Sequence, residues 1–178
     1  MILSEQTFIE LAGKQEVLDA KIKAAKGITE LPLERIELAY RVEAAECVNE
    51  MKGGMKYWSD KPMNREAFLE ELVDALHFYL SYVNHNAKMF PTADAVYEYI
   101  ELEDAYRFGE TWFVDEEPWQ WALRALNPDV EINDWHLRVS FLYLLIIAEH
   151  AGFNEQDIID TYNKKNKTNH DRSDSGVY

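Results

Sequence analysis

The stretch RVEAAECVNE, residues 41–50, decides the fold class, because it has the pattern of one flank of an amphipathic helix. The apolar stripe of this helix consists of Ile36, Tyr40, Cys47 and Met51. At about 100° per residue Glu43 lies about 20° from Ile36, inside the stripe rather than opposite it. Glu46 and Glu50 follow at steps of three and four on the same flank. The question is why a helix should point carboxylates toward its own core.

Capping residues and chain breakers divide the rest of the sequence into further helices. Good N-cap residues precede four expected helices and glycines end two: Ser4, Asn64, Asp134 and Asn154, and Gly27 and Gly152. Pro32 suits the first turn of a helix that Gly53 and Gly54 break. We expect helices over about 5–26, 32–52, 65–88 and 135–151 and a last one from 154, with a polar tail beyond Asn166. No repeat, Gly-rich phosphate loop or strand-like alternation accompanies them, so the sequence predicts an all-α helical bundle, one domain over 1–178.

Residues 91–134 differ from the rest of the chain in composition. From position 94 to position 134 there are twelve acidic and two basic residues. The same region contains Trp112, Trp119 and Trp121. We predict an acidic, partly helical insertion that covers something or pairs with another chain. A solvated face would explain the charge, though not the tryptophans.

The composition limits the classes of function. A chain of 178 residues, 47% hydrophobic and 13% aromatic, is long and apolar enough for a real core. Its net charge of −15 disfavours nonspecific nucleic-acid or anionic-membrane binding, which relies on Lys and Arg clusters. The single cysteine, Cys47, excludes an internal disulfide framework and is expected to be a buried structural thiol. Without a membrane-length apolar run or a signal-peptide pattern, we expect a soluble, cytoplasmic protein with no nucleic-acid or membrane partner.

A second acidic pair answers the opening question. The segment EELVDALHF places Glu71 and Asp74 three residues apart, as Glu43 and Glu46 are on the preceding helix. Three residues is just under one turn, so each pair can reach a common point. Four converging carboxylates repel one another unless cations lie between them. All-oxygen ligands select hard ions such as Mg²⁺ or Mn²⁺, which usually share a phosphate-bearing substrate, so the sequence predicts a magnesium site.

Two other interpretations of these acidic pairs compete with a metal site. Glutamates at such spacings are common on solvated helix faces, where they form surface ion pairs. A carboxylate di-iron bundle would need Glu-x-x-His on two helices, and only Asp74 and His77 come close to that pattern. A metal site is favoured because Glu43 interrupts an apolar stripe and a second pair follows at bundle-like separation.

Five short motifs are spread along most of the chain. They are KQEVLDAKI, VEAAECVNE, KYWS, the ExxD pair followed by ALHF, and the terminal YNKKNKTNHDRSDSGVY. Together they resemble the Q-x-x-L-[DN], VELGELANE-type, F-K-x-W-S, ExxD and Y-x-x-K-N-x-x-N-x-x-R-Q-x-x-G-Y elements of the dimeric all-α dUTPase family. That family belongs to the MazG-like nucleoside triphosphate pyrophosphatases. Two positions depart from its pattern: Ser173 stands where glutamine is usual, and Val177 separates Gly176 from the final Tyr178.

The resemblance implies a homodimeric, Mg²⁺-dependent enzyme, with Mn²⁺ as a substitute, that cleaves dUTP to dUMP and pyrophosphate. The second subunit is expected to complete the site. The implied metal ligands are Glu43, Glu46, Glu71 and Asp74. One of Glu43 and Glu46 would be the base that activates a water. Glu50 is a further ligand, a partner of a ligand, or an exposed residue at the helix end.

The resemblance also implies phosphate-binding residues near the end of the chain. Lys165 and Arg172 would clamp the phosphates, and Asn166 and Asn169 match the same terminal motif. A disordered basic tail is the alternative. Lys56 could reach the same phosphates or be solvated.

A third implied group would bind the nucleoside. Trp58 would stack on the base or anchor its own link on the core. Gln15 has an amide that can match the edge of uracil, and Asp19 could accept a sugar hydroxyl. His77 would line the pocket or be a structural histidine, and Tyr162 belongs to the terminal substrate-binding motif.

Two alternatives to dUTP hydrolysis remain at this stage. A MazG-like pyrophosphatase for another nucleotide, such as dCTP, would share the metal chemistry and differ in the pocket formed by Gln15, Trp58 and His77. An acidic, aromatic-rich binding protein such as a DNA mimic would use the carboxylates only as surface. Substitution of Glu43 by alanine separates an enzyme from a binding protein, because it should abolish hydrolysis and barely affect the partner binding of a DNA mimic.

Overall fold

The structure, a computed structural model, describes residues 1–86, 95–113, 116–127 and 135–176. Within these ranges it contains seven α-helices, one 3₁₀ helix and no strand, which confirms the all-α prediction. The helices are α1 (Glu5–Lys26), α2 (Leu33–Glu50), α3 (Arg65–His85), α4 (Ala95–Phe113), α5 (Pro118–Leu126), α6 (Trp135–His150) and α7 (Glu155–Ser175), and the 3₁₀ helix is η1 (Lys52–Gly54). No helix in the described ranges is long and apolar enough to cross a membrane.

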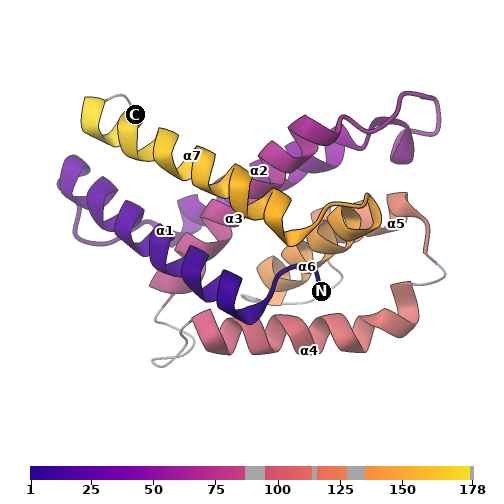
Figure 1. The fold of residues 1–178 in the computed structure, drawn as a ribbon, viewed down its shortest axis with the longest axis horizontal. Helices are drawn as coiled ribbons and strands as arrows, with labels where there is room; N and C mark the ends of the chain where they lie inside the picture. Colours follow the sequence, from indigo (N-terminus) through magenta and orange to yellow (C-terminus); the bar gives the residue numbers. More distant parts are fainter. Residues whose placement is uncertain (87–94, 114–115, 128–134, 177–178) are drawn as a thin grey trace.

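The first and last helices, α1 and α7, lie side by side and run in the same direction (Figure 1). Polar contacts of 2.7 Å join them at three levels: Ser4 to Glu155, Lys14 to Asn163, and Lys21 to Asp174. The predicted ends of α1 are confirmed. Ser4 accepts a hydrogen bond from the backbone N–H of Thr7, and Gly27 closes the helix at a φ of 64°.

The last helix extends through the segment beyond Asn166, for which the sequence suggested only a polar tail. A capping box between Asn154 and Asp157 starts α7, and the helix continues past Asn166 to Ser175, where Gly176 ends it at a φ of 71°. The stretch has few apolar residues, and its contacts with α1 and α3 hold it in place. The polar side chains near the end of the chain therefore lie on an ordered helix.

The helices α2 and α3 pack along each other in opposite directions. The backbone N–H of Asn64 donates to Glu50 O at 3.0 Å, and Cys47 near the end of α2 contacts Phe68 near the start of α3. Cys47 is fully buried, as predicted. Between the helices, Gly53 allows close backbone contact, because a Cβ there would lie 2.4 Å from Ser59 O. The pairing of α2 with α3 sets the two acidic motifs side by side.

One hydrophobic core holds the helices together. Its largest fully buried side chains come from five of the seven helices: Phe8 and Leu11 of α1, Tyr40 of α2, Phe68, Leu72 and Tyr79 of α3, Phe141 of α6 and Tyr162 of α7. The Tyr79 ring stacks on Phe141 with centroids 4.4 Å apart. The core gives the site helices α1, α2, α3 and α7 fixed relative positions.

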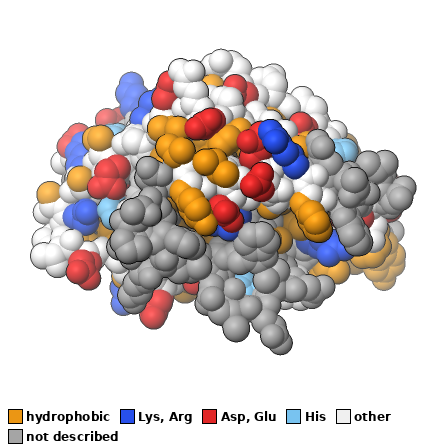
Figure 2. Space-filling model, turned by 90° about the horizontal axis from the view of Figure 1, so that it is seen from below, with side chains coloured by type: hydrophobic (Ala, Val, Ile, Leu, Met, Phe, Trp, Pro, Cys, Tyr) orange, Lys and Arg blue, Asp and Glu red, His pale blue; other side chains and the backbone are white. Residues whose placement is uncertain are grey.

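The predicted insertion forms two helices in its described part, α4 and α5. Arg138 of α6 donates two hydrogen bonds to the Glu98 carboxylate of α4, at 2.8 and 2.7 Å, and one to Glu101 at 3.2 Å. Trp121 is buried and Trp119 is half-exposed, whereas the side chain of Trp112 lies outside the described residues. Figure 2, seen from the side on which α4 lies in Figure 1, shows carboxylates intermixed with hydrophobic side chains.

One expected helix boundary differs from the structure, and two other expected boundaries lie outside the described residues. The third helix ends at His85 rather than Lys88, which lies outside the described residues. Asp134, the expected cap of α6, is also outside them, and so is the start of the insertion at Pro91. The end of α6 is close to the prediction, because Gly152 adopts a φ of 77° two residues after His150.

Candidate active site

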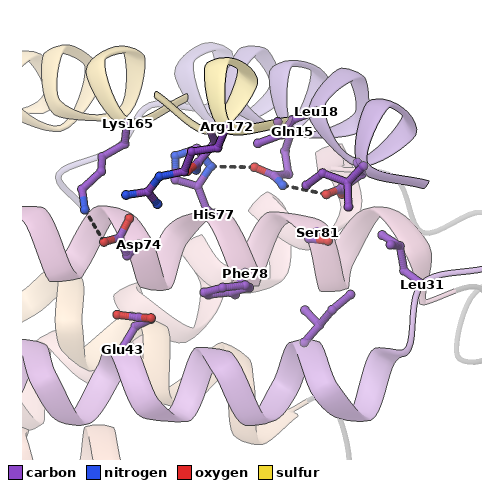
Figure 3. Close-up of a pocket in the computed structure, with 14 residues that line it drawn as sticks. Gln15, Leu18, Leu31, Glu43, Asp74, His77, Phe78, Ser81, Lys165 and Arg172 are labelled. Carbon is purple, nitrogen blue, oxygen red and sulfur yellow. Dashed lines mark hydrogen bonds and ion pairs between the residues drawn. The ribbon is translucent and has the colours of Figure 1, made fainter. Parts of the chain in front are cut away.

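The acidic motifs of α2 and α3 face each other. Carboxylate oxygens of Glu43, Glu46 and Glu71 all lie within 4.8 Å of one another. Asp74, three residues after Glu71, is near enough for its charge to raise the pKa of Glu43. In Figure 3, Glu43 and Asp74 approach the same space from α2 and α3. The fold thus brings the four carboxylates together, although the two pairs are separated by a helix end and a link.

In this partly buried cluster the negative charges lie so close together that Glu43 and Glu71 are harder to ionise than isolated glutamates. Partial burial and the neighbouring carboxylates, Asp74 foremost, raise the pKa of Glu43 to about 7. Burial and the same neighbours also raise the pKa of Glu71. A hydrogen bond between Glu43 and Glu71 favours the protonated form of Glu43. The cluster therefore retains a proton near neutral pH, and a divalent cation would replace that proton.

A lysine from α7 supplies a positive charge at one side of the cluster. Lys165 Nζ lies 2.5 Å from Asp74 Oδ2. Burial acts to lower the pKa of Lys165, but its hydrogen bond to Asp74 and the nearby acidic charges raise it. This one ammonium faces four carboxyl groups, so the negative charge of the site is not balanced within the group.

A cavity of about 330 Å³ lies beside the carboxylates. Eight of the residues predicted for the site line it: Gln15, Asp19, Glu43, Asp74, His77, Lys165, Asn169 and Arg172. In Figure 3 the Arg172 side chain extends from α7 into the space above Asp74, on the side of Lys165. The cavity therefore has one end at Glu43, Asp74 and Lys165, where charged groups gather, and a second end at Gln15, His77 and Asp19, called here the Gln15 end.

Hydrogen bonds fix the orientation of the side chains at the Gln15 end. Asp19 can only accept, so Gln15 turns its Nε2 toward Asp19 Oδ1, at 2.8 Å. Gln15 Oε1 then accepts from His77 Nδ1 at 2.7 Å and from the Tyr162 hydroxyl at 3.2 Å. The Tyr162 ring stacks on His77 with centroids 4.1 Å apart. The amide of Gln15 is thus engaged within the protein.

The same contacts define the hydrogen-bonding character of His77. Burial and the charge of Lys165 lower its pKa to about 3, so the imidazole is neutral. Because Nδ1 donates to Gln15, the proton is on Nδ1 and Nε2 is an acceptor. Nε2 is buried without a hydrogen-bond partner among the described residues. A ligand with an N–H or O–H group would satisfy it.

Four of the predicted substrate-binding residues do not line this cavity. Lys56 donates to Asn49 at 2.7 Å, and Trp58 is 70% exposed, with its ring edge-on to Tyr57 at 4.9 Å. Tyr162 lies behind His77, and Asn166 is half-buried one turn further along α7. Glu50, the uncommitted fifth acid, pairs with Lys52 at 2.8 Å.

The sequence-based hypothesis missed the apolar wall and one histidine. The wall consists of Leu18, Ile22, Leu31, Ile36 and Phe78, with Ser81 among them. Ile36 was assigned to the core, and Phe78 follows His77 within ALHF, which was the available signal for it. His85 contacts Asp19 from the end of α3. Nothing in its sequence position points to the site.

A helical bundle with acidic pairs on two neighbouring helices, beside a cavity with basic and amide side chains, is the architecture of an all-α nucleoside triphosphate pyrophosphatase. More particularly, a family model described as dUTPase matches residues 7–177, so the chain belongs to the dimeric all-α dUTPase family. Membership supports the enzyme class, dUTP diphosphatase, and a nucleotide substrate. The family generally uses a divalent metal. A search of curated proteins found no match.

Proposed function

We propose that this protein is a Mg²⁺-dependent, homodimeric dUTP diphosphatase that holds its metal with Glu43, Glu46, Glu71 and Asp74. The observation that carries the proposal is the approach of three carboxylates to within 4.8 Å beside a cavity with a neutral acceptor and two basic residues. Clustered carboxylate oxygens suit hard divalent ions, Mg²⁺ first and Mn²⁺ as a substitute. The raised pKa of Glu43 fits this role, because it reflects negative charge that the protein leaves uncompensated.

Hydrolysis of dUTP needs a proton acceptor for the attacking water. When bound, the metal would neutralise phosphate charge and make a water molecule more acidic. One of Glu43 and Glu46 accepts the proton of that water as the bond to pyrophosphate breaks. Glu43 lies in the cavity wall and Glu46 is exposed, so both are accessible to water. The products are dUMP and pyrophosphate.

The basic residues of α7 bind the phosphates. Lys165 and Arg172 line the cavity from the same helix, seven residues and about two turns apart. Lys165 also contacts the Asp74 carboxylate, so its ammonium lies between the four carboxylates and the cavity. A charge-assisted hydrogen bond from either residue stabilises the charge that develops on the leaving pyrophosphate. Asn169 lies between them and lines the same wall.

The nucleoside occupies the Gln15 end. His77 Nε2 accepts a hydrogen bond from a donor of the nucleoside, and Phe78 packs against its flat or apolar faces. Asp19 and Gln15 are engaged with each other and with His77, so they shape this end. The N3–H of uracil can donate to this acceptor, whereas N3 of cytosine has no hydrogen and cannot, so the site favours uracil.

A second copy of the chain completes the site. Trp58 and Tyr57 stand exposed on the α2–α3 link, away from the cavity of their own chain, and Leu38 and Val42 form an exposed apolar strip on α2. Aromatic side chains of this kind are enriched where proteins meet. Sedimentation equilibrium should give twice the chain mass of 20.8 kDa. A monomer that hydrolyses dUTP would overturn the dimer and leave the metal site standing.

The test of the function is pyrophosphate release from each deoxynucleoside triphosphate separately, with Mg²⁺ and then with EDTA. We expect turnover of dUTP that EDTA abolishes. Turnover of dCTP or of several nucleotides would retain the metal site and reject the uracil assignment. No turnover of any nucleotide by the folded protein would contradict the proposal.

A further inference from the structure

His85, the last residue of α3, belongs to none of the motifs discussed above, yet its side chain contacts Asp19, which lines the cavity of the candidate site. Its imidazole lines a second hollow of about 510 Å³, formed with Lys23 and residues 29–35. Its Nε2 lies 3.2 Å from Asp19 Oδ2 and 3.2 Å from Glu16 Oε2. Asp19 lines the first cavity. The contact between His85 and Asp19 therefore connects the two hollows.

Asp19 needs such a neighbour because it is buried. Its residue is only 3% exposed, and Oδ1 is used by Gln15. Oδ2 receives no hydrogen bond from the described residues, and the His85 imidazole, whose Nε2 is likewise without a hydrogen bond there, is the neighbour that the structure places 3.2 Å from it. A buried carboxylate without a partner is costly and turns toward water when it can. The imidazole between two carboxylates offsets that cost and holds the carboxylate of Asp19 in place.

The orientation of Asp19, together with the Tyr162 hydroxyl that donates to Gln15 Oε1, sets the orientation of the Gln15 amide. A carboxylate accepts only, so it forces the Nε2 of Gln15 toward itself and the Oε1 toward His77. If the amide of Gln15 turned over, its N–H would face His77 Nδ1. His77 would then carry its proton on Nε2 and present a donor to the cavity instead of an acceptor.

We propose that His85 is a positioning residue that, through Asp19 and Gln15, holds His77 in the Nδ1–H tautomer and so keeps Nε2 as the acceptor in the cavity. The ligand class that this selects is one with an O–H or imide N–H at that end. That last step rests on the proposed function, in which the ligand is a deoxyuridine nucleotide. The tautomer itself is a property of the protein without nucleotide.

The experiment is nitrogen NMR of the histidine rings in nucleotide-free protein, which distinguishes a protonated from an unprotonated ring nitrogen. The wild type should show His77 with Nδ1 protonated and Nε2 unprotonated. In H85F, which removes the partner of Asp19, a substantial Nε2–H population should appear. In D19N, whose amide can donate to Gln15, the Nε2–H tautomer should dominate.

The matched control is E16Q, which removes the other, half-exposed partner of His85 and leaves Asp19 intact, so His77 should keep its wild-type tautomer. Should H85F fail to fold, H85A replaces it with the same expected result. An unchanged His77 tautomer in the folded His85 variant overturns the proposal, whatever D19N shows. A change in the His85 variant without one in D19N also overturns it, because the path would not run through Asp19.

Kinetics supply a second readout. Loss of a positioning contact at the nucleoside end should raise KM for dUTP about tenfold in H85F and change kcat by less than about twofold. A purely structural role would lower the active fraction, and so kcat, without changing KM. If the wild type hydrolyses no dUTP, the proposed function fails, while the NMR experiment still tests the role of His85.

Discussion

Two groups of carboxylates in this molecule meet basic residues in opposite ways. Between α4 and α6, Arg138 is buried and its guanidinium forms three hydrogen bonds with Glu98 and Glu101. Between α2 and α3, four carboxylates approach one another, and the ammonium of Lys165 contacts one of them. The first group, the Arg138 cluster, has one cation for two carboxylates. The second, the acidic cluster, has one cation for four carboxyl groups.

The pKa shifts express the same difference. Burial opposes the charge of Arg138, but its hydrogen bonds and ion pair with Glu98 raise its pKa, so the cation is stabilised. In the acidic cluster, burial and neighbouring charge raise the pKa of Glu43 to about 7, so the anion is destabilised. A group whose ion pairs stabilise its charges serves the fold, whereas one whose charges destabilise each other retains a place for an added cation. The following predictions test this comparison.

Removing a carboxylate from the acidic cluster should have the largest effect. E71Q should lower kcat/KM for dUTP by roughly a thousandfold, because metal ions contribute several kcal/mol to such reactions. Steady-state pyrophosphate release measures this. E70Q is the control, since Glu70 is the half-buried neighbour of Glu71 that lies outside the acidic cluster and pairs with Lys164 at 3.4 Å. Equal activities of E70Q and E71Q would remove the cluster from the mechanism.

Breaking the Arg138 cluster should affect stability instead. R138M leaves Glu98 buried without its cation, which costs about 3–5 kcal/mol of unfolding free energy. Urea denaturation followed by circular dichroism measures the loss. The control is R107M, which breaks an exposed pair with Glu103 and should cost less than about 1 kcal/mol. A small loss in R138M would show that the ion pairs there contribute little to the fold.

Lys165 resembles Arg138 in forming an ion pair within the protein, but it also faces the cavity of the acidic cluster. K165M should lower kcat/KM about 10- to 100-fold, the loss expected for one charge-assisted hydrogen bond of about 1.5–3 kcal/mol. Its neighbour supplies the control: K164M removes a side chain that points to solvent. Kinetics for K165M that match those for K164M would exclude Lys165 from phosphate binding.

The smallest expected effect is a pH dependence of stability. The folded-state pKa of Glu43, about 7, lies above its ordinary value, so its proton favours the folded state at low pH and that contribution is lost as pH rises to 7. In EDTA, E43Q should therefore exceed the wild type in Tm by about 2–4 °C at pH 8, allowing for partial exposure. The difference should vanish at pH 4. Melting curves from pH 4 to 8 that run parallel would contradict this.

Local signals in the sequence predicted much of the fold. Ser4 and Gly27 set the ends of α1 because capping depends on residues next to each other in the chain. Glu43 stood out because it interrupts an apolar stripe. The end of α7 could not be placed in the same way, because its residues beyond Asn166 are polar and are held by contacts with α1 that lie far away in sequence.

The candidate site was likewise predictable only where its residues form short local patterns. The acidic motifs were visible as short patterns, but the Lys165–Asp74 pair joins residues 91 positions apart. His85 had no local signal at all, because its role depends on where α1 crosses the end of α3. Trp58 was expected at the base, and in the single chain it is exposed. The proposed homodimer would give it a role at a second chain, which no local pattern describes.

The most direct test of the central claim is Mn²⁺ binding by the metal-free protein, followed by electron paramagnetic resonance. The wild type should bind Mn²⁺, E43Q and E71Q should lose that binding, and E101Q in the Arg138 cluster should retain it. Mg²⁺ should displace the bound Mn²⁺. Mn²⁺ binding that survives in both E43Q and E71Q, or that is lost in E101Q, would contradict the assignment of the acidic cluster as the metal site.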